Sequence, residues 1–426
     1  MQNWAGNLQY RAAVVKEPTT VDEVRHLVLA ASQTGTVIRA LGTRHSFNDI
    51  ADTDGVLVST RLLTGPISLS AAAAAAAGDA GTVTVGAGIR YGELALWLEE
   101  RGLALANLAS LPHISVGGAT ATGTHGSGDG VSSLAASVVA LDLVDGLGEV
   151  RHLDRSHADF AGAVVALGAL GIVTQVTLSV EPSFQVAQTV YENLSWDALL
   201  GNLDAVTSAG YSVSVFTRWG ESVDQVWVKR RVDSEQGEFA GPDMLLDASA
   251  ATVSLHPLPG VSADSCTPQL GVAGAWLDRL AHFRLDFTPS NGSELQSEYL
   301  VPRQHAVAAL TALRKLGDRI RPELQVCEVR TVAADDLWLS SSYGTDVVGI
   351  HFTWLAHQPE VEALLPVIEQ ALAPFAARPH WGKLFTLGAE ELAALYPRHR
   401  DFTELAARYD PAGLFRNAYL DRVLGR

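Results

Sequence analysis

Residues 115–130 constrain the fold of this chain more than any other part of its sequence. They include six glycines among threonine, serine and alanine, with almost no large side chain. Glycine lets the backbone adopt positive φ angles and lets a ligand approach the main chain, and consecutive N–H groups in such a segment form a concave anion site. Because hydrophobic residues precede this nearly uncharged segment, we expect it to bind a diphosphate group rather than to form a solvent-exposed flexible loop.

Strand and helix patterns alternate along the first 181 residues. Strands are predicted at residues 12–15, 36–41, 55–59, 82–85, 137–144 and 172–180, and helices after a capping box at residues 20–23 and over residues 91–101. Longer β runs follow at residues 186–191, 211–218 and 225–232, then helices near residues 303–316 and 358–373. The order predicts an α+β protein with three parts, which are residues 1–181, 182–376 and 377–426. The last part is expected to fold back on the first, and the seven alanines at 71–77 are interpreted as a connection between subdomains.

The composition argues against some classes of partner. The chain has 426 residues, a net charge of −17 and no basic stripe of the kind that binds nucleic acid. The same acidity disfavours an anionic membrane surface and is compatible with a neutral substrate. We interpret Lys229-Arg230-Arg231 as a solvated strand end. Because no signal peptide follows Met1, we expect a cytoplasmic protein, and we expect it to be a monomer.

Three other kinds of site match the sequence poorly. Residues 86–92 resemble a dinucleotide-binding glycine motif, but the third glycine is one position late and no acidic residue follows at the expected distance. His113 and His125 have no carboxylate neighbour, and no His-Glu-x-x-His pattern occurs, so we expect no metal ion. Cys266 and Cys327 stand in no redox-type spacing and are expected to be reduced and buried.

A histidine stands in the turn after the predicted strand at residues 36–41. His45 follows Gly42, Thr43 and Arg44 at the carboxyl end of that strand, where α/β proteins gather ligands. An exposed imidazole at such a place can act as a nucleophile toward an electrophilic carbon of a cofactor. A lone histidine after a strand is more often structural, so both roles stay open at this point.

Polar residues gather in three segments near the C-terminus. Glu328 and Arg330 alternate in one predicted strand and therefore point to the same face, and so do His351 and Thr353 in another. Lys383 ends a third polar and aromatic segment. If the segments converge in a cleft, they suit a ligand rich in hydroxyl groups. Otherwise the first pair forms a solvated face and Lys383 is a surface lysine.

These motifs together resemble the FAD-linked sugar oxidases of the vanillyl-alcohol-oxidase superfamily, most closely the alditol oxidase branch, over nearly the whole chain. The matching segments are residues 3–7, 42–48, 108–115, 121–126, 298–299, 328–331, 379–383 and 410–413, with Asn417. Residues 108–110, Thr331 and the strand with His351 and Thr353 are more similar to alditol oxidases than to aldonolactone oxidases. Arg44 stands where many members of the wider family have glycine.

The resemblance implies a two-subdomain FAD-binding domain of the PCMH type over residues 1–181. It also implies a substrate domain over residues 182–376 that has a large antiparallel sheet and flanking helices. His45 would bond covalently to the 8α carbon of FAD. The other residues implied to bind FAD are Leu41, Gly42, Thr43, Arg44, Ser46, Ser110, Ser115, Gly118, Thr122, Gly123, Thr124, His125, Ile172 and His380. Those implied to line the substrate site are Ser110, Glu328, Arg330, His351, Thr353 and Lys383.

The implied activity is oxidation of the terminal primary alcohol of an alditol such as xylitol or sorbitol to the aldose, with O2 reduced to H2O2. In this hypothesis Lys383 is the base and Arg330 stabilises the developing alkoxide. Glu328 orients Arg330 and accepts hydrogen bonds from substrate hydroxyls, and His351 is a further catalytic residue. The alternatives are an aldonolactone oxidase or dehydrogenase with the same fold, and a non-catalytic flavin-binding protein.

Overall fold

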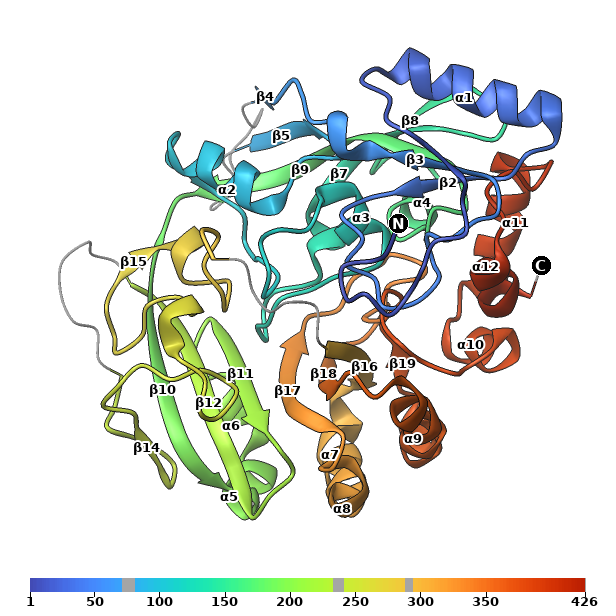
Figure 1. Ribbon diagram of the computed structural model, residues 1–426. Helices are drawn as coiled ribbons and strands as arrows, with labels where there is room; N and C mark the ends of the chain where they lie inside the picture. The colour runs from blue at the N-terminus through green and yellow to red at the C-terminus, as the bar shows by residue number, and fades with distance from the viewer. Residues whose placement is uncertain (71–80, 233–240, 288–293, 426) are drawn as a thin grey trace.

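The computed structural model describes residues 1–70, 81–232, 241–287 and 294–425, and its strands form three sheets (Figure 1). The alanine run at residues 71–77 lies outside the described residues. The smallest sheet is parallel and has the order β1-β3-β2, from Val14–Lys16, Val56–Ser59 and Ile38–Leu41. Helix α1 (Val21–Thr34) connects β1 to β2. As the capping box predicts, the Glu23 N–H donates to the Thr20 hydroxyl at its start.

The second sheet has six strands and forms the rest of the N-terminal half. Its order is β4-β5-β9-β7-β8, from Ser68–Ser70, Gly81–Gly86, Ile172–Pro182, Val138–Val144 and Val150–Asp154, and β6 (Leu103–Ala104) also pairs with β9. Strand β9 alternates strictly between buried and half-buried residues over most of its length. This period of two is typical of a strand with one face in the core. The helices of this half are α2 (Tyr91–Glu99), α3 (Val116–Ala121) and α4 (Phe160–Ala163).

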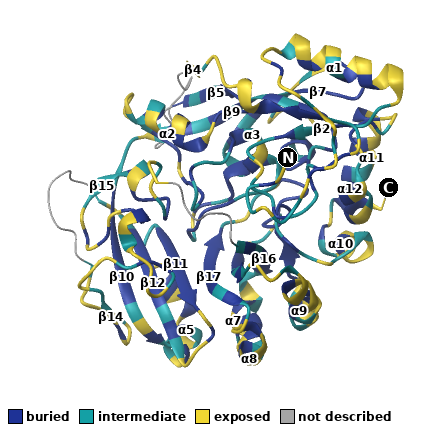
Figure 2. Cartoon of the chain, in the orientation of Figure 1, coloured by how far each residue is buried: buried dark blue, intermediate teal, exposed yellow. Residues whose placement is uncertain are grey.

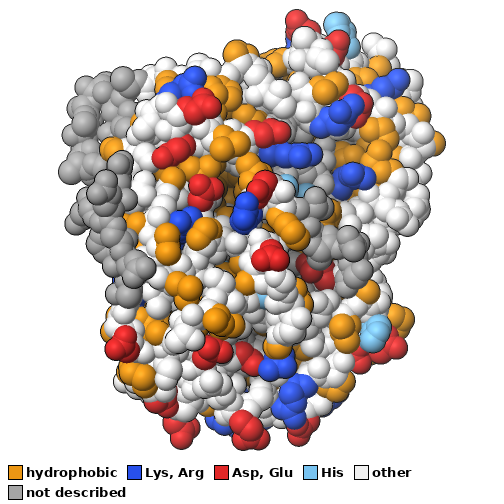
Figure 3. Space-filling view, turned by 60° about the vertical axis from the view of Figure 1, so that its left-hand side comes forward, with side chains coloured by type: hydrophobic (Ala, Val, Ile, Leu, Met, Phe, Trp, Pro, Cys, Tyr) orange, Lys and Arg blue, Asp and Glu red, His pale blue; other side chains and the backbone are white. Residues whose placement is uncertain are grey.

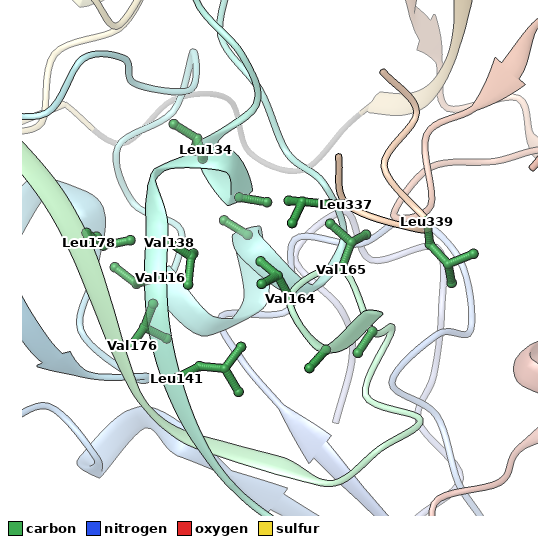
Figure 4. Close-up of a cluster of buried hydrophobic side chains, with 14 of the residues drawn as sticks. Val116, Leu134, Val138, Leu141, Val164, Val165, Val176, Leu178, Leu337 and Leu339 are labelled. Carbon is green, nitrogen blue, oxygen red and sulfur yellow. The ribbon is translucent and has the colours of Figure 1, made fainter. Parts of the chain in front are cut away.

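The glycine-rich segment begins with a short helix, α3, rather than a loop throughout. Val116, the first residue of α3, is fully buried and belongs to one hydrophobic cluster with Val138, Val176 and Leu178 of the sheet (Figure 4). The cluster anchors α3 against β7 and β9. The small residues that follow Val116 are thereby held in place, although they have no large side chains that could pack in the core.

The third sheet has ten strands and is antiparallel at each strand pair. Its order is β13-β14-β10-β12-β11-β17-β18-β16-β19, from Met244–Leu245, Ala248–Ala250, Gln185–Ser195, Ser222–Val232, Ser212–Thr217, Leu324–Val332, Val347–Leu355, Glu294–Pro302 and Arg378–Pro379, while β15 (Gly274–Ala275) pairs with β10. The prediction of an α+β fold with a large antiparallel sheet is confirmed.

One face of this sheet packs on a layer of helices, and part of the other face packs on the segment of residues 255–283. The helices are α5 (Trp196–Gly201), α6 (Leu203–Thr207), α7 (Ala306–Arg314), α8 (Gly317–Ile320) and α9 (Gln358–Leu372), seen at the bottom of Figure 1. Strand residues such as Val329, Ile350 and Phe352 share a hydrophobic cluster with Leu310 and Leu365 of these helices. Because side chains alternate along a strand, the residues between them, including Glu328 and His351, point to the opposite face.

The C-terminal segment returns to the N-terminal half. Its helices are α10 (Ala389–Leu395), α11 (His399–Tyr409) and α12 (Ala418–Leu424), and they stand beside that half in Figure 1. Leu392, Phe402 and Tyr419 share the hydrophobic cluster that contains Val116. The domain boundaries at 181 and 376 stay a prediction.

Burial follows the amphipathic patterns, with one important exception. The outward side of α1 is exposed and the large sheet is buried (Figure 2), and acidic and basic side chains are interspersed on the face shown in Figure 3.

Within the described residues, no helix is long and apolar enough to cross a membrane. Cys266 and Cys327 are free and buried, as predicted. The interpretation of Lys229 as solvated is wrong, because residues 280–282 cover it and leave it 1% exposed.

Candidate active site

A cavity of about 710 Å³ is lined by residues from all three parts of the chain. The turn after β2 and the glycine-rich segment contribute to it from the N-terminal half. Strands β11, β16, β17 and β18 contribute the face of the large sheet that carries polar residues, and residues 380–383 contribute from the C-terminal segment. The cavity therefore brings together the three regions that the sequence predicted to carry the site.

Two glycines let the turn after β2 approach the start of α3. A Cβ atom on Gly42 would lie 2.8 Å from the Ser115 hydroxyl oxygen, and one on Gly118 would lie 2.9 Å from it. The Ser115 N–H donates to the Thr43 hydroxyl at 3.3 Å, while the Ser115 hydroxyl is buried and has no protein partner. A close backbone approach beside an unpartnered buried hydroxyl is a cradle that a polar ligand such as a diphosphate can fill.

His45 lies in this turn with one ring nitrogen unused. Its ring stacks on Trp4 with centroids 5.4 Å apart, and its buried Nδ1 atom has no hydrogen-bond partner. Burial, helped by His113 and Arg90, lowers the pKa of His45 to about 4, so the imidazole is neutral at neutral pH and its lone pair is free. Arg44 adopts the left-handed conformation, with φ of 66°, which glycine adopts at least steric cost.

The turn with His45 is bound directly to the segment that ends at Lys383. The Asn48 side-chain amide donates to the carbonyls of Trp381 at 2.8 Å and Lys383 at 2.7 Å. The Phe47 N–H donates to the Gly382 carbonyl at 2.8 Å. The two segments are more than 330 residues apart in sequence, yet these bonds fix one against the other.

Three polar residues form a row across the large sheet. Strand register places His351 of β18 opposite Glu298 of β16 on one side and opposite Glu328 of β17 on the other. Phe216 of β11 continues the row beyond Glu328. Arg330 lies two positions from Glu328 on the same face, as predicted, and is 5% exposed. The alternative of a solvated face for Glu328 and Arg330 is therefore wrong.

Glu298 is the centre of the charge cluster, although the sequence did not predict it as a site residue. Its carboxylate is fully buried and lies 2.6 Å from Lys383 Nζ, 2.8 Å from Arg330 Nη2 and 3.2 Å from His125 Nε2. Burial works to raise the pKa of Glu298, but Lys383 and Arg330 outweigh it and hold the pKa well below its usual range. The sequence does contain a signal for it. Gln296 lies two positions before Glu298 in the same strand, so both polar side chains point to one face of the sheet.

Lys383 is a largely buried amine rather than a surface lysine. Its side chain is 12% exposed. Burial lowers the pKa of Lys383, and the charge of Glu298 offsets only part of that effect. The neutral amine is therefore more accessible here than on a lysine in water.

Glu328 has a second set of partners. Its Oε1 atom lies 2.7 Å from His282 Nε2 and 3.7 Å from Arg330 Nε, and its Oε2 atom lies 3.6 Å from His351 Nδ1. Burial lowers the pKa of His351 to about 4, so this ring is neutral. His282 is a second residue that sequence reasoning missed, because it lies in an irregular segment where no periodicity indicates its direction.

Most of the other predicted residues also line the cavity. They are Leu41, Thr43, Arg44, Ser46, Ser110, Gly118, Thr122, Thr124, His125, Thr353 and His380. Gly123 follows the C-cap residue of α3 with φ of 67°, and its neighbours Thr122 and Thr124 line the cavity while Gly123 does not. The Ile172 side chain packs in a hydrophobic cluster with Val24 and Val28, while Gly171 and Val173 line the cavity beside it. The roles of all these residues stay predictions.

The cavity and the family models that match the chain define a flavoprotein oxidoreductase. The family model for the FAD binding domain matches residues 12–154, and the model for D-arabinono-1,4-lactone oxidase matches residues 288–423. A solvent-stable cholesterol oxidase has the same fold, with a TM-score of 0.80 at 17% identity over 100% of this chain and 97% of that one.

Relatives of known name place the chain within this class. It is 48% identical to the alditol oxidase of Streptomyces sp. (strain IKD472 / FERM P-14339) over 99% of this chain and 98% of that protein. It is 30% identical to the L-gulono-1,4-lactone dehydrogenase of Mycobacterium tuberculosis over 99% and 98%. The chain belongs to the alditol oxidase branch of the FAD-linked sugar oxidases.

Proposed function

We propose that this protein is an FAD-dependent oxidase that converts the terminal primary alcohol of an alditol, such as xylitol or sorbitol, to the aldose and reduces O2 to H2O2. The observation that carries the proposal is the buried cluster of Glu298, Glu328, Arg330 and Lys383 beside the turn with His45. Alternating donors and acceptors suit a chain of hydroxyl groups. The alditol oxidase relative supports the same substrate class.

The residues present fit FAD. The cradle at Gly42, Ser115 and Gly118 suits its diphosphate, and His45 stands with an unused nitrogen. When bound, FAD supplies the two-electron acceptor for the alcohol carbon and passes the electrons to O2.

Residues of the protein accept the alcohol proton and stabilise the negative charge that develops on the substrate oxygen. The Lys383 amine accepts the alcohol proton, and the ammonium that results stays paired with Glu298 at 2.6 Å. Arg330 donates to the oxygen that develops negative charge. Glu328 accepts hydrogen bonds from neighbouring substrate hydroxyls, and neutral His351 beside it donates or accepts one more.

We further propose that the unpartnered Nδ1 atom of His45 would bond to the 8α carbon of the cofactor. Forming this bond would release one proton from the imidazole and one from the carbon, and the two electrons would pass to the flavin and then to O2. Denaturing the wild-type protein in acid should leave the yellow colour in the pellet, whereas the His45→Ala variant should release all of it to the supernatant. His26→Ala, on the exposed side of α1, is the matched control and should retain the flavin. Release of flavin from the denatured wild type would show that the bond does not form.

Anaerobic titration of the purified protein with xylitol tests the proposed activity. We expect the visible flavin absorption to bleach with xylitol and to recover when air is admitted, with one H2O2 per turnover. Bleaching by gulonolactone but not by xylitol would assign an aldonolactone oxidase or dehydrogenase instead. A flavin that neither substrate bleaches would indicate a non-catalytic flavin-binding protein.

A cytoplasmic location and a monomeric state complete the proposal. Sedimentation of the purified protein tests the monomer, and fractionation of the producing cells tests the location.

A further inference from the structure

Lys229 is a buried lysine for which the proposed reaction has no role. It lies in β12 opposite Ser212 of β11 and is 1% exposed. Its Nζ atom lies 2.6 Å from the Leu280 carbonyl oxygen, 3.1 Å from the Ala281 carbonyl oxygen and 3.1 Å from His282 Nδ1. An ammonium group has three protons and no lone pair. Burial lowers the pKa of Lys229 to about 7, so part of this lysine carries its charge near neutral pH. In the ammonium form two protons go to the two carbonyl oxygens, and the third goes to the imidazole Nδ1, which then accepts.

His282 connects this lysine to the active site. Its ring is 5% exposed and lies edge-on between Phe216 and Trp227, with centroids 5.6 Å and 5.3 Å away. Burial, followed by the charge of Lys229, lowers the pKa of His282 to about 4, so the ring is neutral. When Nδ1 accepts from the ammonium, the single ring proton is on Nε2, which lies 2.7 Å from Glu328 Oε1 and 3.4 Å from the Ser214 hydroxyl.

The opposite tautomer fits the surroundings poorly. It would direct the bare lone pair of Nε2 at a carboxylate oxygen 2.7 Å away unless Glu328 carried a proton. Burial works to raise the pKa of Glu328, but Arg330 and His282 outweigh it and hold the pKa well below its usual range. Glu328 is therefore ionised and needs a donor from His282. With Oε1 held in this way, Oε2 is the oxygen left for the substrate.

We propose that Lys229 and His282 are positioning residues: the Lys229 ammonium fixes the Nε2–H tautomer of His282, and that N–H orients the Glu328 carboxylate toward the substrate hydroxyl groups. The proposal rests on the proposed function only for the identity of the substrate. It assigns a role to two residues that touch neither the cofactor turn nor Lys383. It also gives a reason for the burial of Lys229, whose amine contacts two carbonyl oxygens and the His282 ring rather than a carboxylate.

A double-mutant cycle with Glu328 tests the positioning role. His282→Phe keeps the aromatic packing and removes the donor, and we expect kcat/KM for xylitol to fall by about 10- to 100-fold, chiefly through a higher KM. His282→Gln keeps an N–H within reach of Glu328 and should recover most of the loss. In a Glu328→Gln background, His282→Phe should cost less than about two-fold more, because the residue acts through Glu328. Equal losses in both backgrounds would overturn the proposal.

A measurement without turnover tests the tautomer and separates the two proposals. In protein labelled with ¹⁵N-histidine, the His282 signals are assigned by their absence in His282→Phe. Below the Lys229 pKa of about 7, we expect a protonated Nε2 and an unprotonated Nδ1 in the wild type. This preference should weaken in Lys229→Met but not in Lys315→Met, which changes an exposed lysine at the end of α7. A protonated Nδ1 in the wild type would overturn the inference even in an active enzyme. If the predicted tautomer is found but xylitol is not oxidised, the proposed function fails and the Lys229–His282 arrangement stands.

Discussion

Replacing Lys383 with methionine lowers kcat for xylitol oxidation by about 10²- to 10⁴-fold, which is the contribution of a positioned general base. Methionine matches the length of the lysine stem, so the cavity wall stays filled. What it removes is the amine 2.6 Å from Glu298. FAD content should not change, because the Asn48 amide contacts only the backbone carbonyl of residue 383.

The measurement is single-turnover bleaching of the flavin by xylitol, which isolates the chemical step from product release. Lys315→Met changes a lysine that is exposed at the end of α7 and should leave kcat as in the wild type. An unchanged bleaching rate in Lys383→Met would exclude the lysine as the base.

The pH dependence gives the same role a second readout. Lys383 accepts a proton only as the neutral amine, which accumulates above its pKa. Because burial lowers that pKa, with Glu298 opposing the effect only in part, kcat/KM should rise with pH along a limb that lies below the ordinary lysine range. This rising limb should be missing in Lys383→Met.

Replacing Arg330 with methionine lowers kcat/KM by about 10²- to 10³-fold, the usual loss when a donor to a developing oxyanion is removed. Arg330 is 5% exposed and lies 2.8 Å from Glu298 and 3.7 Å from Glu328. Without it, two buried carboxylates lose a shared cation. We therefore also expect a lower melting temperature for this variant.

Arg330→Lys separates the charge from the geometry. A lysine keeps one positive charge but cannot present a planar set of donors to both carboxylates, so it should recover the stability more fully than the rate. Thermal unfolding and steady-state kinetics with xylitol are the two measurements, and Arg400→Met, at a side chain 89% exposed, is the control. A rate that recovers fully in Arg330→Lys would show that charge alone is needed there.

Local patterns predicted several parts of the site correctly. The alternation in residues 327–331 and 351–354 placed Glu328 with Arg330 and His351 with Thr353, because side chains on a strand change face at every residue. The glycines around Ser115 predict that a ligand approaches the main chain; Gly42 and Gly118 bring the turn after β2 close to Ser115, and the ligand stays a prediction. These features depend only on neighbouring residues, so the sequence contains them.

The same patterns failed where burial decides the outcome. Lys229 was interpreted as solvated because two arginines follow it, and a strand's period does not say what covers its face. Residues 280–282 cover Lys229, and the irregular segment that carries them has no periodicity to reveal their direction. Glu298 was missed for a related reason, since its partners Lys383 and Arg330 lie 85 and 32 positions away.

The sequence by itself determined the fold class, the glycine-rich segment that is proposed to hold the cofactor, and the faces of the strands that carry the polar residues. Only the tertiary structure decided which of these residues meet, since sheet register sets Glu298, His351 and Glu328 in one row and Asn48 binds the turn of His45 to residues 381–383. The physical reason is the distance along the chain over which each interaction acts. Backbone propensity and side-chain alternation act between neighbours, whereas charge pairing and burial depend on segments that come together only when the whole chain is folded.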